Sequence, residues 1–284
     1  MSLSENDKKF ISNAVKFFEE PTLFTKSLSL AGNVLEGAMA RLPDKAKTAV
    51  LNTSRTALEQ CLKVAVSSVN DMPPQSVDFA QAAHLNKIKS RYHTAANTVA
   101  GGVSGFMGPQ AMIVELPLTT TVIMRSIVST AADFGFDIRH PDVLMECLFV
   151  FAVSGPSAKD DGMNSAYLSS RLSYASMIRA ASQSLAGQSA KELLATVESR
   201  STPTLVKLIA EIAEIFGIRV SKKLATQMLP LVGAIGGAGI NYAFTDFFGK
   251  AAHFHFGLKH LENTHTKESI QSFYLSEVAR IKQT

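Results

Sequence analysis

Two stretches of this chain, residues 94–114 and 224–245, contain no charged residue. Each is as long as the roughly 20 residues that a membrane-spanning helix needs. Both are rich in Gly, Ala, Thr and Asn instead of Leu and Ile, and each is interrupted by a proline, Pro109 or Pro230. Proline removes a backbone donor and fixes φ, so it ends or bends a helix. The composition therefore predicts two broken helices more readily than two transmembrane spans.

Small residues recur four positions apart within both stretches. One row is Ala96, Ala100, Ser104 and Gly108, and the other is Gly233, Gly237 and Asn241. Such rows flatten one side of a helix, so that two backbones can approach closely. Glycine costs about 1 kcal/mol at a helical position relative to alanine, so this enrichment needs a structural reason. Two interpretations stay open: tight packing inside a soluble core, and contact with a lipid or a bilayer interface.

Helical periodicity dominates the rest of the chain, because apolar residues recur three and four positions apart. No alternating β-branched run lies beside a hairpin turn, so strand signals are poor. We therefore predict an all-α fold: a single multi-helix domain of about nine to eleven helices with a central pair of glycine-rich broken helices. Residues 1–80 are expected to form an N-terminal helical segment that packs on a core of residues 81–284.

Several helix ends can be assigned from local signals. Ser189 and Glu192 form a capping box, and Pro203 is suited to a first helical position. Gly217 is expected to act as a C-terminal cap for the helix that starts at Pro203. A last helix is predicted over residues 267–282.

Composition narrows the class of protein. The chain has 18% charged residues, below the roughly 25% of typical soluble domains, and a formal net charge of +4. Two cysteines, Cys61 and Cys147, exclude a disulfide scaffold and favour a reducing compartment. The N-terminus has neither a secretory signal nor a lipidation motif, so we expect a cytoplasmic protein. No basic cluster with interleaved aromatic residues predicts nucleic-acid binding.

Catalytic motifs are nearly absent. There is no phosphate-binding loop, dinucleotide fingerprint or hydrolase nucleophile elbow, so we expect no cofactor and lean towards a non-enzymatic role. The exception is a histidine-rich segment near residues 253–265. His253 and His260 share a helix face seven residues apart, whereas helical metal ligands more often lie three or four apart. They are weak candidates for metal ligands.

Two blocks of the sequence carry a family resemblance. The first combines Gly101-Gly102-Val-Ser-Gly105-Phe-Met-Gly108 with Glu115-Leu116-Pro117, Arg125 and Gly135-Phe136-Asp137, and the second is Leu229-Pro230-Leu-Val-Gly233-Ala-Ile-Gly236-Gly237 followed by Asn241. This pattern resembles the EcsC family, which is named for a product encoded beside an ABC exporter. The resemblance implies a bacterial accessory protein, cytoplasmic or peripheral to the inner membrane and associated with an ABC transporter. It implies no reaction.

The first block also has a physical interpretation. Pro117 is suited to the first turn of a helix, which would place Glu115 at the positive end of the helix dipole. Arg125 lies about 15 Å further along such a helix. We expect Arg125 to form a core ion pair, for example with Asp133, or to bind an anion such as a phospholipid phosphate.

These observations lead to a functional hypothesis with two alternatives. The chain is expected to be a non-enzymatic accessory protein of the bacterial inner-membrane surface that engages a phospholipid or a membrane protein. The contact residues would be Gly101, Gly102, Gly105, Gly108, Glu115, Pro117, Arg125, Pro230, Gly233, Gly237 and Asn241. One alternative is a soluble helical scaffold that forms a homodimer. The other is a metal-dependent enzyme that uses residues 253–265.

Overall fold

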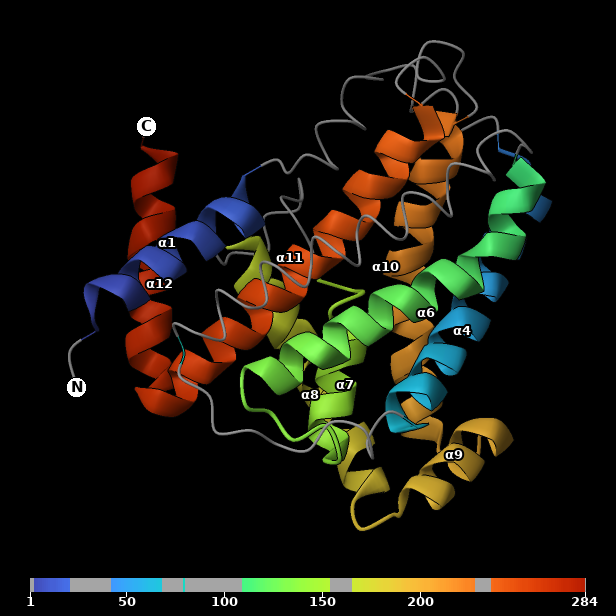
Figure 1. Cartoon of the computed structure of the whole chain (residues 1–284), viewed down its shortest axis with the longest axis horizontal. Helices are drawn as coiled ribbons and strands as arrows, with labels where there is room; N and C mark the ends of the chain where they lie inside the picture. The colour runs from blue at the N-terminus through green and yellow to red at the C-terminus, as the bar shows by residue number, and fades with distance from the viewer. Residues whose placement is uncertain are drawn as a thin grey trace.

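The structure is a computed structural model that describes residues 3–20, 42–67, 79, 109–153, 165–227 and 236–283, with backbone alone for 109–115, 226–227 and 236–241. These residues form nine helices and no strand (Figure 1). The helices are α1 (Glu5–Glu19), α4 (Asp44–Ser67), α6 (Pro109–Asp133), α7 (Pro141–Phe149), α8 (Ala166–Leu185), α9 (Ala190–Ser199), α10 (Pro203–Gln227), α11 (Gly236–Thr264) and α12 (Lys267–Lys282). The predicted all-α fold is confirmed.

Local capping signals place several helix ends correctly. The Ser189 side chain accepts a hydrogen bond from the Glu192 backbone, and the Glu192 carboxylate reaches back to Ser189, as a capping box requires. Helix α10 begins at Pro203, and α12 covers the predicted residues 267–282. These ends could be predicted because each signal lies within four residues of the boundary that it sets.

The prediction that Gly217 ends a helix was wrong, because α10 continues for ten residues beyond it to Gln227. A Cβ atom built at Gly217 would lie 3.6 Å from Ser54 Oγ and 3.8 Å from Leu51 Cα. Both of these residues belong to α4. The glycine is therefore a point of close approach between α4 and α10, and its conformation is helical.

Two further expectations about the first motif were also wrong. Helix α6 begins at Pro109, not near Leu116, so Pro117 lies inside the helix and not in its first turn. Glu115 is consequently the seventh residue of α6 and does not lie at the positive end of its dipole. The helix begins earlier because Pro109 provides the fixed φ that suits a first position. Pro117 removes one backbone donor inside α6.

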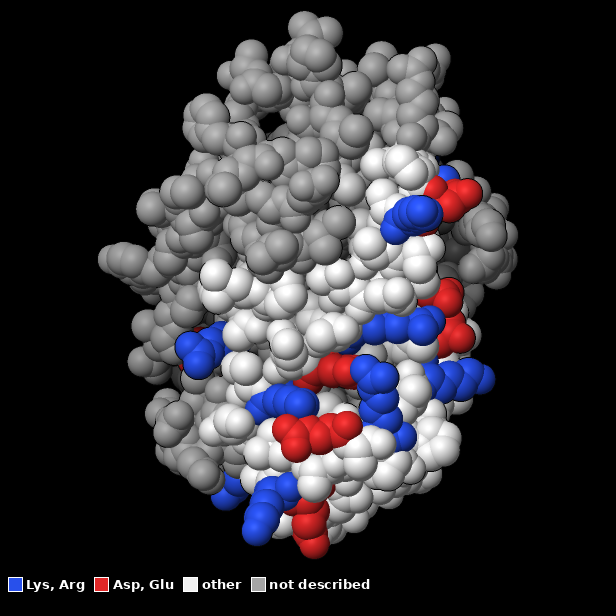
Figure 2. Space-filling model, turned by 90° about the vertical axis from the view of Figure 1, so that its right-hand side faces the viewer, with Lys and Arg blue, Asp and Glu red and all other residues white. Residues whose placement is uncertain are grey.

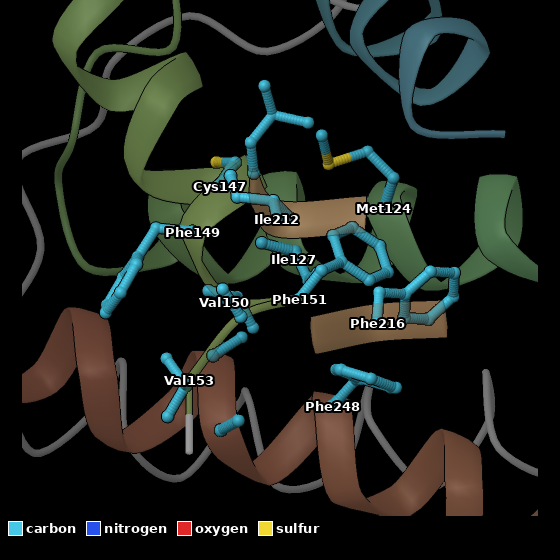
Figure 3. Close-up of a cluster of buried hydrophobic side chains, with 14 of the residues drawn as sticks. Met124, Ile127, Cys147, Phe149, Val150, Phe151, Val153, Ile212, Phe216 and Phe248 are labelled. Carbon is cyan, nitrogen blue, oxygen red and sulfur yellow. The ribbon is translucent and has the colours of Figure 1, made fainter. Parts of the chain in front are cut away.

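The centre of the core is α7 together with the four residues that follow it. Every residue from Cys147 to Val153 has zero exposed surface. Figure 3 shows this segment enclosed by side chains of α6, α10 and α11, among them Ile127, Phe216 and Phe248. An element that is apolar on all sides must be surrounded by others, and α4, α6, α8 and α10 pack directly against α7. Cys61 and Cys147 are free thiols within this core.

Helices α6 and α11 contain or continue the two uncharged stretches, and they pack against each other. Figure 1 shows both starting at the upper right of the molecule and running towards the lower left. Helix α10 runs in the opposite sense and ends beside the start of α11 (Figure 1). We call this part of the molecule, where α6 and α11 begin and α10 ends, the glycine-flanked end.

Helix α1 packs across α11 and α12 at the other side of the molecule (Figure 1). Its Glu19 carboxylate accepts hydrogen bonds from Ser165 Oγ at 2.6 Å, the Ala166 backbone at 2.9 Å and Tyr274 Oη at 3.0 Å. The partly buried Glu19 carboxylate thereby joins α1 to the first turn of α8 and to α12. Gly257 of α11 allows the Phe10 ring of α1 to lie directly on the α11 backbone.

No helix within the described ranges is long and apolar enough to cross a membrane.

Candidate functional site

Most of the contact residues predicted from the sequence cannot be placed. Gly101, Gly102, Gly105, Gly108, Pro230 and Gly233 lie outside the described residues. Gly237 and Asn241 lie in the first two turns of α11, and Glu115 lies in α6, with only their backbones described. The Pro117 side chain is partly buried. The structure does show the helix ends that border these residues. The starts of α6 and α11 and the end of α10 all lie at the glycine-flanked end.

The expectation that Arg125 is buried in a core ion pair was wrong. Its side chain is exposed, whereas its α6 neighbours Met124 and Ser126 are buried. An exposed arginine keeps its hydration, so it needs no carboxylate partner in the core. The error arose because an arginine within an apolar run can lie on the solvent face of an amphipathic helix.

Three large apolar side chains are exposed near the glycine-flanked end. Leu118 of α6 is 62% exposed, Ile218 of α10 is 49% exposed and Tyr242 of α11 is 44% exposed. Each lies within ten residues of the helix end that borders an uncharged stretch, which corresponds to about 15 Å along a helix. Single exposed apolar residues are common on protein surfaces, so these three side chains matter here because of their position beside the uncharged stretches.

Charged side chains gather on a different part of the surface. Figure 2 shows the side that carries α4 and α9, where basic and acidic residues are interspersed over the described residues of the lower half. Two ion pairs join these helices, Lys63 to Glu198 at 3.0 Å and Arg200 to Glu59 at 2.9 Å. These ion pairs hold α9 against the C-terminal half of α4.

The histidine segment lies in α11 and is built into the core. His253 packs against the rings of Phe10 and Phe134, with centroids 5.3 and 5.6 Å away. His260 Nδ1 is 3.0 Å from the Phe134 carbonyl oxygen, and its ring stacks on Phe79. The described residues contain no group of three or more His, Cys, Asp or Glu side chains arranged to hold a metal ion.

A buried polar network crosses the core beside these histidines. His255 has no exposed surface; its Nδ1 is 3.0 Å from Tyr167 Oη, and its Nε2 is 3.0 Å from Glu146 Oε2. The other Glu146 oxygen accepts a hydrogen bond from Lys259. Because a carboxylate can only accept, the His255 proton is on Nε2, and Nδ1 accepts from Tyr167. The network joins α7, α8 and α11.

The protonation states of this network follow from burial and neighbours. Burial lowers the pKa of His255 below its ordinary value, although Glu146 acts in the opposite direction. Burial alone would raise the pKa of Glu146, but the hydrogen bond from His255 and the neighbouring Lys259 side chain outweigh it and hold that pKa below its usual range. Burial raises the pKa of Tyr167. At neutral pH the network therefore holds a carboxylate, an ammonium, a neutral imidazole and a phenol.

This network opens into a cavity of about 540 Å³ between α7, α8, α11 and α12. A second ion pair lines it, in which Arg171 holds Glu262 through two hydrogen bonds of 2.7 and 2.9 Å. Both partners are largely buried, with side chains 16% and 10% exposed. The volume is within the range of small-molecule sites, so this cavity is the clearest candidate binding site in the described part of the chain.

The sequence analysis missed this site. The sequence feature that best indicates this site is Glu146, which is the one charged residue in the apolar run from Val143 to Val153. A carboxylate in such a run must have a partner if the run is buried. Its partners His255 and Lys259 are more than 100 positions away in the sequence, so spacing could not identify them.

The buried imidazole predicts a pH dependence of stability. Because the pKa of His255 is lower in the folded state, the unfolded chain binds one more proton as the pH falls below about 6.5. The contribution of His255 to the free energy of unfolding is thus fully present well above that value, and it should be lost progressively as the pH falls from 7.5 to 5.5. Urea unfolding at both pH values measures it. His255→Gln should lose less stability over this interval than the wild type, and an equal loss in both proteins would contradict the assignment.

The geometry defines an all-helical protein with a charged cavity and, among the residues described, no metal cluster. Comparison with protein families then identifies it: the model of the EcsC protein family matches residues 11–261. The chain belongs to the EcsC protein family. The match covers most of the chain. No curated protein and no solved structure matches the chain.

Proposed function

We propose that this EcsC family protein is a non-enzymatic accessory protein of the bacterial inner-membrane surface, and that its glycine-flanked end contacts lipid. The observation that carries the proposal is that α6 and α11, which contain or continue the uncharged stretches, pack together and begin at the same end of the molecule. The exposed Leu118, Ile218 and Tyr242 lie near this end. Association with an ABC transporter stays a prediction from the family resemblance.

Apolar burial and charge would both contribute to such a contact. Full burial of a leucine or isoleucine side chain stabilises binding by about 1.5–3 kcal/mol, and Leu118 and Ile218 have roughly half of their surface free. Lys45 and Lys222 are exposed and lie close to the start of α4 and the end of α10, respectively. Each basic residue near an anionic membrane contributes about 1 kcal/mol. Binding is therefore expected to favour anionic lipid and to weaken at high salt.

Co-sedimentation with vesicles tests this proposal. The wild-type chain should sediment with anionic vesicles more than with zwitterionic ones. Leu118→Asp and Ile218→Asp should each weaken binding about tenfold, because each change removes roughly 1.4 kcal/mol of apolar burial. All three proteins should keep the same helical circular dichroism, since both side chains are at the surface.

The matched control is on the same helix as Ile218. Val206 is 38% exposed and lies near the start of α10, about 18 Å from Ile218 along the helix axis. Val206→Asp should bind vesicles as the wild type does. If the wild type stays in the supernatant with anionic vesicles, or if Val206→Asp and Ile218→Asp lose binding equally, the proposal fails.

A further inference from the structure

The cavity between α7, α8, α11 and α12 has two chemically different sides. Apolar residues come from one face of α8 and one face of α12, namely Leu168, Leu172, Ala175, Ile178 and Leu275. Leu172 is 65% exposed and Leu275 is 38% exposed. Charged residues of α7 and α11 form the floor, where Glu146 pairs with Lys259 and Arg171 of α8 pairs with Glu262. A ligand that fits both sides must carry a polar head and an apolar part.

The sign of the head follows from the charges that line the cavity. Four basic side chains, Arg171, Arg179, Lys259 and Lys267, face three carboxylates, Asp142, Glu146 and Glu262. Four positive charges against three negative charges leave one net positive charge, and His255 adds none while it is neutral. Lys259 and Arg171 balance the two floor carboxylates. The excess positive charge therefore comes from Arg179 and Lys267 against Asp142, and the lining as a whole favours an anion over a cation.

Hydrogen-bond donors remain available on the floor. A lysine has three N–H donors and an arginine has five. The ion pairs use one donor of Lys259 and two of Arg171. Both side chains line the cavity and keep part of their surface exposed, 23% for Lys259 and 16% for Arg171. A phosphate group has three acceptor oxygens for such donors, and Arg recognises phosphate well because of its planar fork.

We propose that this cavity binds a phosphate monoester that carries a short apolar chain. The phosphate lies on the floor, near Lys259 and Arg171, and the chain lies along Leu172 and Leu275. Arg179 and Lys267, which are exposed at the rim, add positive charge where the ligand enters. The inference does not depend on the proposed membrane contact, because α12 and the glycine-flanked end lie on opposite sides of the molecule (Figure 1).

Isothermal titration calorimetry of the full chain with octyl phosphate tests the proposal. Inorganic phosphate and octanol, which represent the head and the chain of this ligand, are titrated separately for comparison. Octyl phosphate should bind at least about tenfold more tightly than either of these compounds. Leu172→Gln and the double variant Arg179→Gln/Lys267→Gln should each weaken it about tenfold. These three residues are exposed, so the variants should stay folded. Arg280→Gln, an exposed position of α12 outside the cavity, should bind as the wild type does.

Vesicles distinguish the source of the ligand. If the ligand is a bilayer lipid with a phosphate monoester head group, Leu172→Gln weakens binding to both octyl phosphate and vesicles that contain phosphatidic acid. If a soluble phosphate ester is the ligand, Leu172→Gln weakens octyl phosphate binding alone, while Ile218→Asp weakens vesicle binding alone. Either result supports the cavity as a site. Absence of octyl phosphate binding at millimolar concentration, or equal binding by the wild type and both cavity variants, overturns the proposal.

Discussion

Gly257→Ala is expected to destabilise the protein by about 3 kcal/mol, the upper part of the range for overpacking a core. A Cβ atom at this position would overlap Phe10 Cζ and lie 2.6 Å from Cε1. The ring cannot move away freely, because the rings of Phe79 and Phe254 lie 5.1 and 5.5 Å from it. Urea unfolding followed by helical circular dichroism measures the loss, and a loss below about 1 kcal/mol would contradict the close approach of α1 and α11.

Two further variants separate the contact from the effect of changing a helical glycine. Gly217→Ala adds the same methyl group inside α10, where the nearest side-chain atom is 3.6 Å away. It should leave stability unchanged or raise it by up to about 1 kcal/mol, since alanine is the better helix former. Phe10→Leu in the Gly257→Ala background should recover part of the loss, because it removes the ring atoms that the new methyl group meets.

Arg171→Met is expected to destabilise the protein by about 3–5 kcal/mol, which is typical when one partner of a buried ion pair is removed. The Glu262 carboxylate would then stay in a site where 10% of its side chain is exposed and both of its hydrogen bonds to Arg171 are lost. The same urea unfolding experiment measures the loss in the free energy of unfolding. The double variant Arg171→Met/Glu262→Met should be much closer to the wild type, because no uncompensated charge remains.

The control is an ion pair of similar length in which the arginine is exposed. Arg280 contacts Glu277 at 2.8 Å in α12, with the arginine side chain 61% exposed. Arg280→Met should cost less than about 1 kcal/mol, since solvent screens such pairs. If Arg171→Met cost no more than Arg280→Met, the Arg171–Glu262 pair would not be the buried contact that the structure describes.

The parts of the fold that could be predicted from the sequence are those with local causes. The capping box at Ser189 and the start at Pro203 involve residues next to the boundary, and they were confirmed. Gly217 was assigned wrongly because its role depends on Ser54 and Leu51 of another helix. Helix propensity is a weak guide wherever such a tertiary contact decides the outcome.

The candidate site could be predicted less well than the fold. The glycine rows predicted close helix contact, but most of their residues lie outside the described part of the chain. The close approaches at Gly217 and Gly257 lie outside those rows and depend on residues of other helices. The Glu146 network depends on residues that only the folded chain brings together. Periodicity identifies which face of a helix is buried. It does not identify which buried polar groups meet.

The most direct test of the membrane contact uses the absence of tryptophan from the chain. Leu118→Trp would introduce a single tryptophan at the glycine-flanked end, and Val206→Trp would introduce one near the start of α10. On addition of anionic vesicles, the emission of Leu118→Trp should shift to shorter wavelength as the ring enters an apolar environment, while that of Val206→Trp should not change. No shift for Leu118→Trp, or equal shifts for both, would contradict the proposed function.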